Sequence, residues 1–191
     1  MKLLEYKGLA LRTAAKSDSK HQDLMHAASG LVTEIGEIVD QYKRAIFYKK
    51  EYDLTHLLEE VGDVMWYLAL ALEATGTDLT FTEEKDLGEE AVGSMPLESI
   101  LAKLVYNAAA VFSCSFTYTN TAEQEAMSGH YGYYLKNILL NIRFFCAKMS
   151  IDYEESKVKN IAKLKARYPE GFSEEAAVNR DIEAERKVLE G

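Results

Sequence analysis

Two pairs of acidic residues stand inside apolar runs of helical periodicity, and this combination restricts the folds open to the chain. Glu34 and Glu37 are three residues apart in the first run, and Glu60 and Asp63 repeat that spacing in the second. Side chains three residues apart share one face of a helix, with their Cβ atoms about 5–6 Å apart. If the two helices pack antiparallel, all four carboxylates converge on one place. The pattern therefore predicts a helical hairpin with acids at its centre.

The apolar neighbours of these acids indicate that the shared face is partly buried. They are Leu31, Val32, Ile35, Ile38 and Val39 in the first run, and Leu57, Leu58, Val61, Val64, Met65 and Leu68 in the second. Two carboxylates roughly 5 Å apart repel by about 3 kcal/mol at an effective dielectric constant of about 20. Four such groups need a cation or raised pKa values, and clusters of oxygen ligands suit Mg²⁺ or Mn²⁺. The prediction is a metal site, and the alternative is a solvated acidic helix face.

Helical periodicity and capping signals extend over nearly the whole chain. Helices are expected over Leu3–Ala15, from Ser19 to about Tyr48, from Leu54 to Thr75, from Pro96 to about Thr117, from a capping box at Thr121–Gln124 to about Met149, from Asp152 to before Pro169, and from Ser173 to Leu189. Residues 77–95 are expected to form an irregular connection, and no strand pair with a hairpin turn is apparent. The prediction is one all-α domain over residues 1–191, with a four-helix-bundle core and additional N- and C-terminal helices.

The apolar pattern of the first hairpin, about residues 19–76, recurs in a second one, about residues 96–150. At an offset of 73, Leu31, Val32, Ile35, Ile38 and Val39 match Leu104, Val105, Ala108, Val111 and Phe112; at an offset of 74, Val61, Val64, Met65, Trp66 and Leu68 match Leu135, Ile138, Leu139, Leu140 and Ile142. The four acids correspond to Asn107, Ala110, Tyr134 and Asn137. We interpret the chain as two fused hairpins, of which the second has lost its acids and become scaffold. Coincidence of helical periodicity is the alternative.

Composition disfavours some partners. The net charge of −9 disfavours a broad electrostatic grip on nucleic acid, so no nucleic-acid partner is expected. The longest apolar run, Val64 to Leu72, is about half the length of a membrane span, and the first residues lack a signal-peptide core. We therefore expect no membrane partner and a cytoplasmic location.

Three blocks of sequence resemble the MazG-like all-α nucleoside triphosphate pyrophosphohydrolases. They are Leu24–Asp40, which holds Glu34-Ile35-Gly36-Glu37; Leu58–Leu68, which holds Glu60-Val61-Gly62-Asp63; and the tail Asn160–Phe172, which ends in Arg167-Tyr168-Pro169-Glu170-Gly171-Phe172. The blocks follow the family's order but leave out the stretch from about Thr80 to Ile151. The resemblance implies hydrolysis of a nucleoside triphosphate between its α- and β-phosphates, giving a monophosphate and diphosphate, with Mg²⁺ or Mn²⁺ as cofactor. Phosphoribosyl-ATP pyrophosphohydrolases share the helical fold, but the tail fits them less well.

The resemblance also implies roles for particular residues. Glu34, Glu37, Glu60 and Asp63 would ligate the metal, and Glu37 or the adjacent Glu59 would act as general base through water. Asn160, Lys163 and Arg167 share a helical stripe in a tail of about residues 151–190 that would close over the substrate. By its position, about two turns after the first motif, Lys43 could reach the terminal phosphates; the alternative is a solvated helix end. His26 could line a pocket, but a core or surface position is the default expectation for it, and Trp66 and Tyr67 are expected mainly in the core.

The sequence leaves the base and the sugar of the substrate open. In the resembled family, chains with a single hairpin pair to complete a bundle, whereas this chain is expected to build the bundle internally; a homodimer is left open. The alternative function is that of a non-catalytic helical protein that binds metal or nucleotide, or mediates partner contacts. The second hairpin shows that the acids can be lost while the apolar pattern is kept. All four acids of the first hairpin are intact, which speaks against the alternative.

Overall fold

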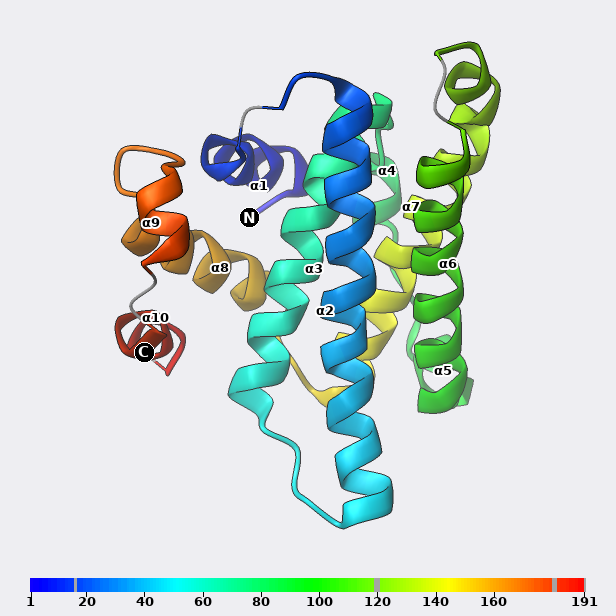
Figure 1. The fold of residues 1–191 in the computed structure, drawn as a ribbon. Helices are drawn as coiled ribbons and strands as arrows, with labels where there is room; N and C mark the ends of the chain where they lie inside the picture. The colour runs from blue at the N-terminus through cyan, green and yellow to red at the C-terminus, as the bar shows by residue number, and fades with distance from the viewer. Residues whose placement is uncertain (16, 119–120, 180–181, 191) are drawn as a thin grey trace.

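A computed structural model describes residues 1–15, 17–118, 121–179 and 182–190, and these residues form helices and no strand. The α-helices are α1 (Leu3–Ala10), α2 (Lys20–Tyr48), α3 (Leu54–Thr75), α4 (Thr80–Glu84), α5 (Glu89–Ser94), α6 (Leu97–Thr117), α7 (Thr121–Met149), α8 (Tyr153–Arg167), α9 (Glu174–Val178) and α10 (Ile182–Glu190) (Figure 1). A 3-10 turn, η1 (Leu11–Thr13), follows α1. The prediction of an all-α fold is confirmed.

Side chains fix several helix ends where the sequence predicts them. The Ser19 hydroxyl accepts a hydrogen bond from an amide in the first turn of α2, and Asp53 caps α3 in the same way. The carboxylate of Asp152 accepts hydrogen bonds from two amides of α8. At the end of α3, Gly76 has a φ of 67°, a left-handed conformation that glycine adopts at little cost. The lengths of the central helices therefore follow from local signals.

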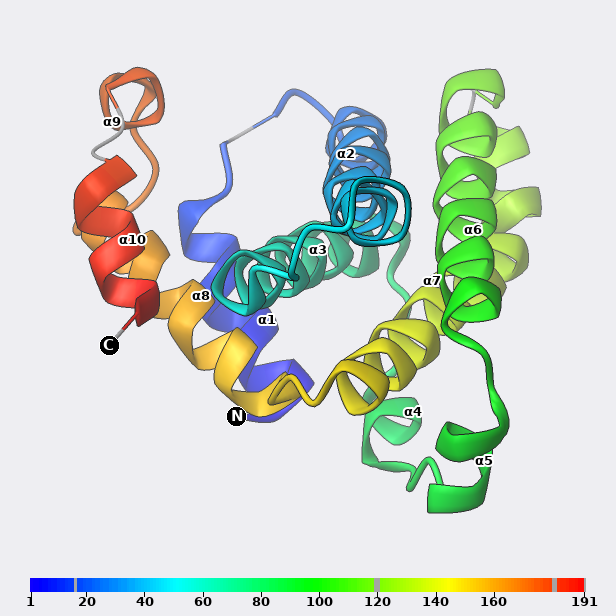
Figure 2. The ribbon, with the colours of Figure 1, turned by 90° about the horizontal axis from the view of Figure 1, so that it is seen from below.

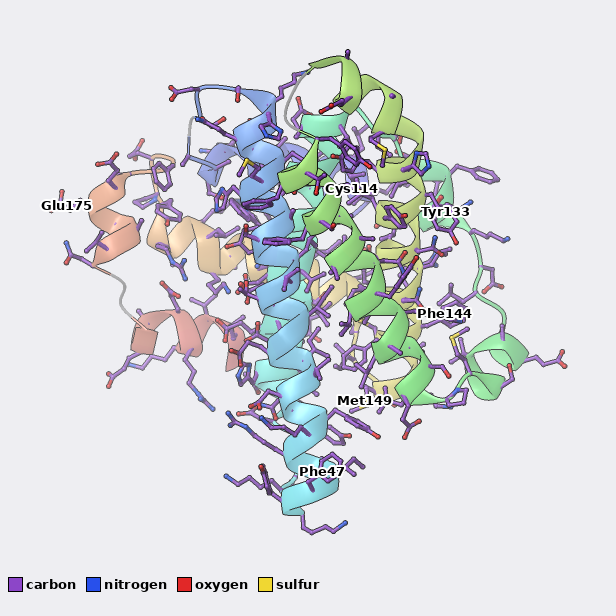
Figure 3. All side chains as sticks on the ribbon, turned by 45° about the vertical axis from the view of Figure 1, so that its right-hand side comes forward. Phe47, Cys114, Tyr133, Phe144, Met149 and Glu175 are labelled. Atoms are coloured by element: carbon purple, nitrogen blue, oxygen red, sulfur yellow. The ribbon has the colours of Figure 1, made fainter. Side chains whose placement is uncertain are left out.

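Four long helices form the centre of the molecule. α2 and α3 pack antiparallel as one hairpin, α6 and α7 form a second, and the hairpins meet through contacts of α2 with α6 and of α3 with α7 (Figure 1). Buried apolar residues of this centre include Leu31, Ile35, Ile38, Val61, Val64, Met65, Leu68, Leu104, Ala108, Val111, Leu135, Ile138, Leu139 and Ile142. Val32, Val105 and Phe112 of the matched pattern are instead exposed, as is Phe47 at the tip of the first hairpin (Figure 3).

The C-terminal segment covers the side of α3 that faces away from α6 (Figures 1 and 2). α8 packs against α3, α1 contacts both α3 and α8, and α10 contacts α8 and α3. The acids of α3 therefore face side chains that come about a hundred positions later in the chain, and this arrangement builds the site described below.

The two ends of the chain differ from the prediction. The helix expected over Ser173–Leu189 is divided into α9 and α10, because Asn179 leaves helical geometry with φ −100° and ψ 63°. The first helix ends at Ala10 and tightens into η1 instead of continuing to Ala15, because Ala14 is extended with ψ 137°. Local polarity did not reveal either break.

The connection between the hairpins also differs from the prediction, since residues 77–95 contain the short helices α4 and α5. The Arg143 guanidinium of α7 donates hydrogen bonds to the carbonyls of Thr82 and Lys85 at 3.0 and 2.8 Å. These distant contacts stabilise turns that show no apolar period of their own. The capping box predicted at Thr121–Gln124 involves side chains outside the described ones.

Among the described residues, α6 is the one helix long and apolar enough to cross a membrane. In the most apolar window of this helix, 39% of the residues are buried in the protein, and the helix packs against α2 and α7. The core helix of a folded domain meets the same criterion, so α6 is weak evidence for a membrane partner.

The second hairpin has no acid at the positions that match the first. Asn107 Nδ2 donates to the Lys103 carbonyl at 2.6 Å, and Asn137 Nδ2 donates to the Tyr133 carbonyl at 2.8 Å. Both amides are therefore engaged with their own helices. A two-fold relation between the hairpins stays a prediction.

Candidate active site

Three carboxylates from α2 and α3 meet in the first hairpin. Glu34 comes from α2 and Glu60 and Asp63 from α3, and one oxygen of each lies within 4.8 Å of the others. Glu60 is buried, while Glu34 and Asp63 are half-buried. The acids face one another because the amphipathic faces that carry them pack together. Three oxygen ligands at such separations can hold one hard cation.

The electrostatics of this group favour binding of a positive charge. Burial raises the pKa of Glu60 to about 9, and its hydrogen bond with Glu34 and the nearby charges of Asp63 and Glu59 add to the effect. Burial also raises the pKa of Glu34. Oε2 of Glu60 is buried and has no hydrogen-bond partner among the described residues. A bound cation would displace the retained proton of Glu60 and would give its buried oxygen a partner. The three carboxylates therefore fit Mg²⁺ as ligands.

Two residues of α8, Lys163 and Asn160, contact the Asp63 carboxylate. Lys163 Nζ lies 2.7 and 2.6 Å from the two oxygens of Asp63 and 3.1 Å from Oε1 of Glu59. Asn160 Nδ2 donates to Oδ1 of Asp63 at 2.7 Å. Lys163 and Asn160 are each only 1% exposed. Both residues, predicted to touch substrate, are thus committed to orienting the acids.

A cavity of about 390 Å³ opens beside the acids. It is lined by Thr13, Ala15, His26, Glu34, Glu59, Glu60, Asp63, Trp66, Tyr67, Leu164, Arg167, Tyr168, Phe172 and Ala177. Acidic groups thus share the cavity with aromatic side chains and one guanidinium. A ligand with a charged part and a flat apolar part matches this division.

The aromatic part of the cavity is built around Tyr67. The Tyr67 ring lies edge-on to Trp66 at 4.8 Å and to His26 at 5.6 Å between ring centroids. Trp66 Nε1 donates to the Thr13 hydroxyl at 3.0 Å, which fixes its ring. Burial lowers the pKa of His26 and raises that of Tyr67 to about 12, so both are neutral near pH 7. All three side chains line the cavity, although the sequence favoured a core or surface position for His26 and a core position for Trp66 and Tyr67.

Close approach of the Tyr67 ring to α2 depends on Gly30. A Cβ atom at Gly30 would lie 2.2 to 2.3 Å from three ring atoms of Tyr67. No side chain larger than hydrogen fits there without displacing the ring. The glycine therefore determines where this wall of the cavity stands.

Arg167 lines the cavity but already has a carboxylate partner. Its Nε donates to Oε1 of Glu185 at 2.6 Å, and its Nη2 contacts the other oxygen. Glu185 belongs to α10 and is buried. A phosphate would compete with Glu185 for the same guanidinium.

The structure does not bring Glu37 and Lys43 to the site. Glu37 is exposed and lies outside the group of three acids, because three residues turn a helix by about 300° and leave it about 60° away from Glu34. Lys43 is nine residues from Glu34, about 13 Å along α2. It is half-exposed and paired with Asp40, and it does not line the cavity. The predicted phosphate contact of Lys43 is therefore not supported.

His56 is a neighbour of the acids that sequence reasoning missed. Its Nδ1 lies 2.8 Å from Oε1 of Glu60, one helical turn away in α3. The four-residue spacing of the two side chains in a predicted helix was a signal that could have revealed this contact.

Comparisons of the chain with protein-family models, with curated proteins and with solved structures find no match.

Proposed function

We propose that this protein is a Mg²⁺-dependent nucleoside triphosphate pyrophosphohydrolase of the MazG-like type. The observation that carries the proposal is the group formed by Glu34, Glu60 and Asp63, whose ligand oxygens lie within 4.8 Å of one another beside a cavity with an aromatic wall. The acids suit a cation that binds phosphate, and the wall suits a nucleobase. A cytoplasmic location belongs to the same proposal, and a homodimer is left open.

The cation would be held by Glu34, Glu60 and Asp63. A cation bound there would supply positive charge to the phosphate oxygens and would make an attacking water more acidic. Mn²⁺ has the same ligand preference as Mg²⁺. Lys163 and Asn160 keep the Asp63 carboxylate in position for such a ligand.

The other residues divide the remaining tasks. Glu59 lines the cavity and can accept a proton from an attacking water. Arg167 can bind the diphosphate portion once it exchanges Glu185 for phosphate oxygens. The nucleobase would pack against the uncharged aromatic rings of Trp66, Tyr67 and His26.

The proposal is tested by incubating the protein with each of the eight common ribo- and deoxyribonucleoside triphosphates and Mg²⁺ in ¹⁸O-labelled water. Products are separated by chromatography and weighed by mass spectrometry. We expect nucleoside monophosphate and inorganic diphosphate as products. The product that carries the ¹⁸O label identifies the phosphorus atom that the water attacks. Formation of nucleoside diphosphate and free phosphate would contradict cleavage between the α- and β-phosphates.

Variants connect the activity to the site. Glu60→Gln should abolish turnover while helical circular dichroism is retained, whereas Glu51→Gln, a change of the same kind in the loop between α2 and α3, should not. Turnover by wild-type protein in excess chelator would refute the metal requirement. No turnover of any of the eight nucleotides would favour the non-catalytic alternative.

A further inference from the structure

A buried tyrosine of the N-terminal helix reaches the group of acids through one intermediary. Tyr6 of α1 is 0% exposed, and its hydroxyl donates to Oδ1 of Asn160 at 2.7 Å. The same hydroxyl lies 3.2 Å from the carbonyl of Gly62, the residue before Asp63. Tyr6 thus contacts both α3 and α8 where they meet.

The chemistry of the intermediary makes this contact directional. A side-chain amide has an acceptor oxygen at one end and a donor nitrogen at the other. The Tyr6 hydroxyl donates to the oxygen of Asn160, and the nitrogen is left to donate to Asp63 at 2.7 Å. If the amide were flipped, its oxygen would face an oxygen of the Asp63 carboxylate, and two acceptors would oppose each other. Burial raises the pKa of Tyr6 well above its usual value, so the hydroxyl remains a donor at any ordinary pH.

Backbone geometry holds the three residues close together. A Cβ atom at Gly62 would lie 2.8 Å from Cβ and 3.1 Å from Nδ2 of Asn160. The glycine therefore lets α8 approach α3 closely enough for Asn160 to reach both Tyr6 and Asp63.

We propose that Tyr6 is a positioning residue of the candidate metal site, which fixes the Asn160 amide so that it presents the Asp63 carboxylate to a divalent cation. This inference rests on the proposed function, since it takes Asp63 to be a metal ligand. Tyr6 itself touches neither cation nor substrate. The sequence gives no signal for this contact, because Tyr6 lies 57 positions before Asp63 and 154 positions before Asn160.

The alternative is that Tyr6 only fills space in the core. Tyr6→Phe separates the two roles because it keeps the ring and removes the hydroxyl. Tyr131→Phe is a matched control: Tyr131 is 2% exposed in α7, and its hydroxyl has no hydrogen-bond partner among the described residues. A core role would affect stability only.

The first measurement needs no metal. In the NMR spectrum of the metal-free protein, the Asn160 side-chain amide protons should exchange slowly with solvent in wild type and in Tyr131→Phe. They should exchange at least several-fold faster in Tyr6→Phe, where the amide is free to turn. Unchanged exchange in Tyr6→Phe would overturn the inference whatever the metal does.

The second measurement is the affinity for Mn²⁺, titrated calorimetrically. Losing one hydrogen bond should weaken binding about three- to tenfold in Tyr6→Phe, and Tyr6→Phe should add little once Asn160→Ala is present, because both act through one contact. Equal affinities of wild type and Tyr6→Phe, or additive effects of the two changes, would refute the positioning role while leaving the metal site intact. Absence of Mn²⁺ binding by wild type would refute the proposed metal site and the positioning role together, whereas the exchange measurement would still report the contact with Asn160.

Discussion

Replacing Gly30 and Gly36 by alanine should have opposite effects, although both glycines lie in α2. Alanine is more favourable than glycine in a helix interior by about 1 kcal/mol, and this gain applies to both positions. At Gly36 no atom lies within 4 Å of the new Cβ. We therefore expect Gly36→Ala to raise the free energy of unfolding by about 1 kcal/mol.

At Gly30 the new Cβ would lie 2.2 Å from the Tyr67 ring, which would have to retreat by about 1.2 Å to reach the 3.4 Å at which ordinary contact begins. Trp66 and His26 pack against the same ring and oppose this movement. Overpacking of this kind costs about 1–3 kcal/mol. Gly30→Ala should therefore be less stable than Gly36→Ala by about 1–3 kcal/mol, and the common gain in helix propensity cancels from this difference.

Urea unfolding followed by far-UV circular dichroism measures both free energies. The chain has a single tryptophan, Trp66, whose ring lies 4.8 Å from that of Tyr67, so its fluorescence reports displacement of the wall. The fluorescence of the folded state should change in Gly30→Ala and not in Gly36→Ala. Equal stabilisation by the two changes, with unchanged fluorescence in both, would show that Tyr67 does not press on α2 and would refute the reasoning.

Three further predictions follow from the charged groups of the site. Because the pKa of Glu60 rises from 4.5 in the unfolded chain to about 9 in the folded one, chiefly through burial, the folded state keeps a proton that the unfolded state releases. The contribution of this carboxyl to the stability of the metal-free protein should therefore be fully present below about pH 4.5 and be lost as pH rises through about 9, so that above pH 5 the free energy of unfolding of Glu60→Gln should fall less with pH than that of wild type in urea titrations. Lys163→Ala should lower the free energy of unfolding by roughly 2–4 kcal/mol, because the carboxylates of Glu59 and Asp63 lose their buried ammonium partner. Lys165 is exposed on the same helix, and Lys165→Ala should change the free energy of unfolding by less than about 0.5 kcal/mol. Similar losses in the two variants would contradict a stabilising role of the Lys163 ion pairs. Glu185→Gln should tighten binding of a nucleoside triphosphate roughly tenfold in equilibrium titration, because it weakens the competitor for Arg167, and weaker binding would show that Arg167 needs Glu185 for its position.

The sequence by itself determined the helical hairpin and its acidic face. Ser19, Asp53 and Gly76 act on the backbone within a few residues, so the limits of α2 and α3 could be predicted from local chemistry. The pairing of Glu34 with Glu60 and Asp63 could also be predicted, because two amphipathic helices joined by a short loop bury their apolar faces together and bring the flanking acids into contact. Periodicity could not tell that Glu37 would point to solvent, since this depends on the angle at which the helices cross.

Only the tertiary structure decided what covers that face. Periodicity puts Asn160 and Lys163 on one stripe of α8, but it does not say whether the stripe faces substrate or Asp63. The answer depends on how closely α8 docks on Gly62, and on a tyrosine from the other end of the chain. Likewise, Arg167 meets Glu185 because α10, a helix separate from α9, packs against α8. These contacts join residues that are distant in sequence, and their geometry is set by packing that no local pattern encodes.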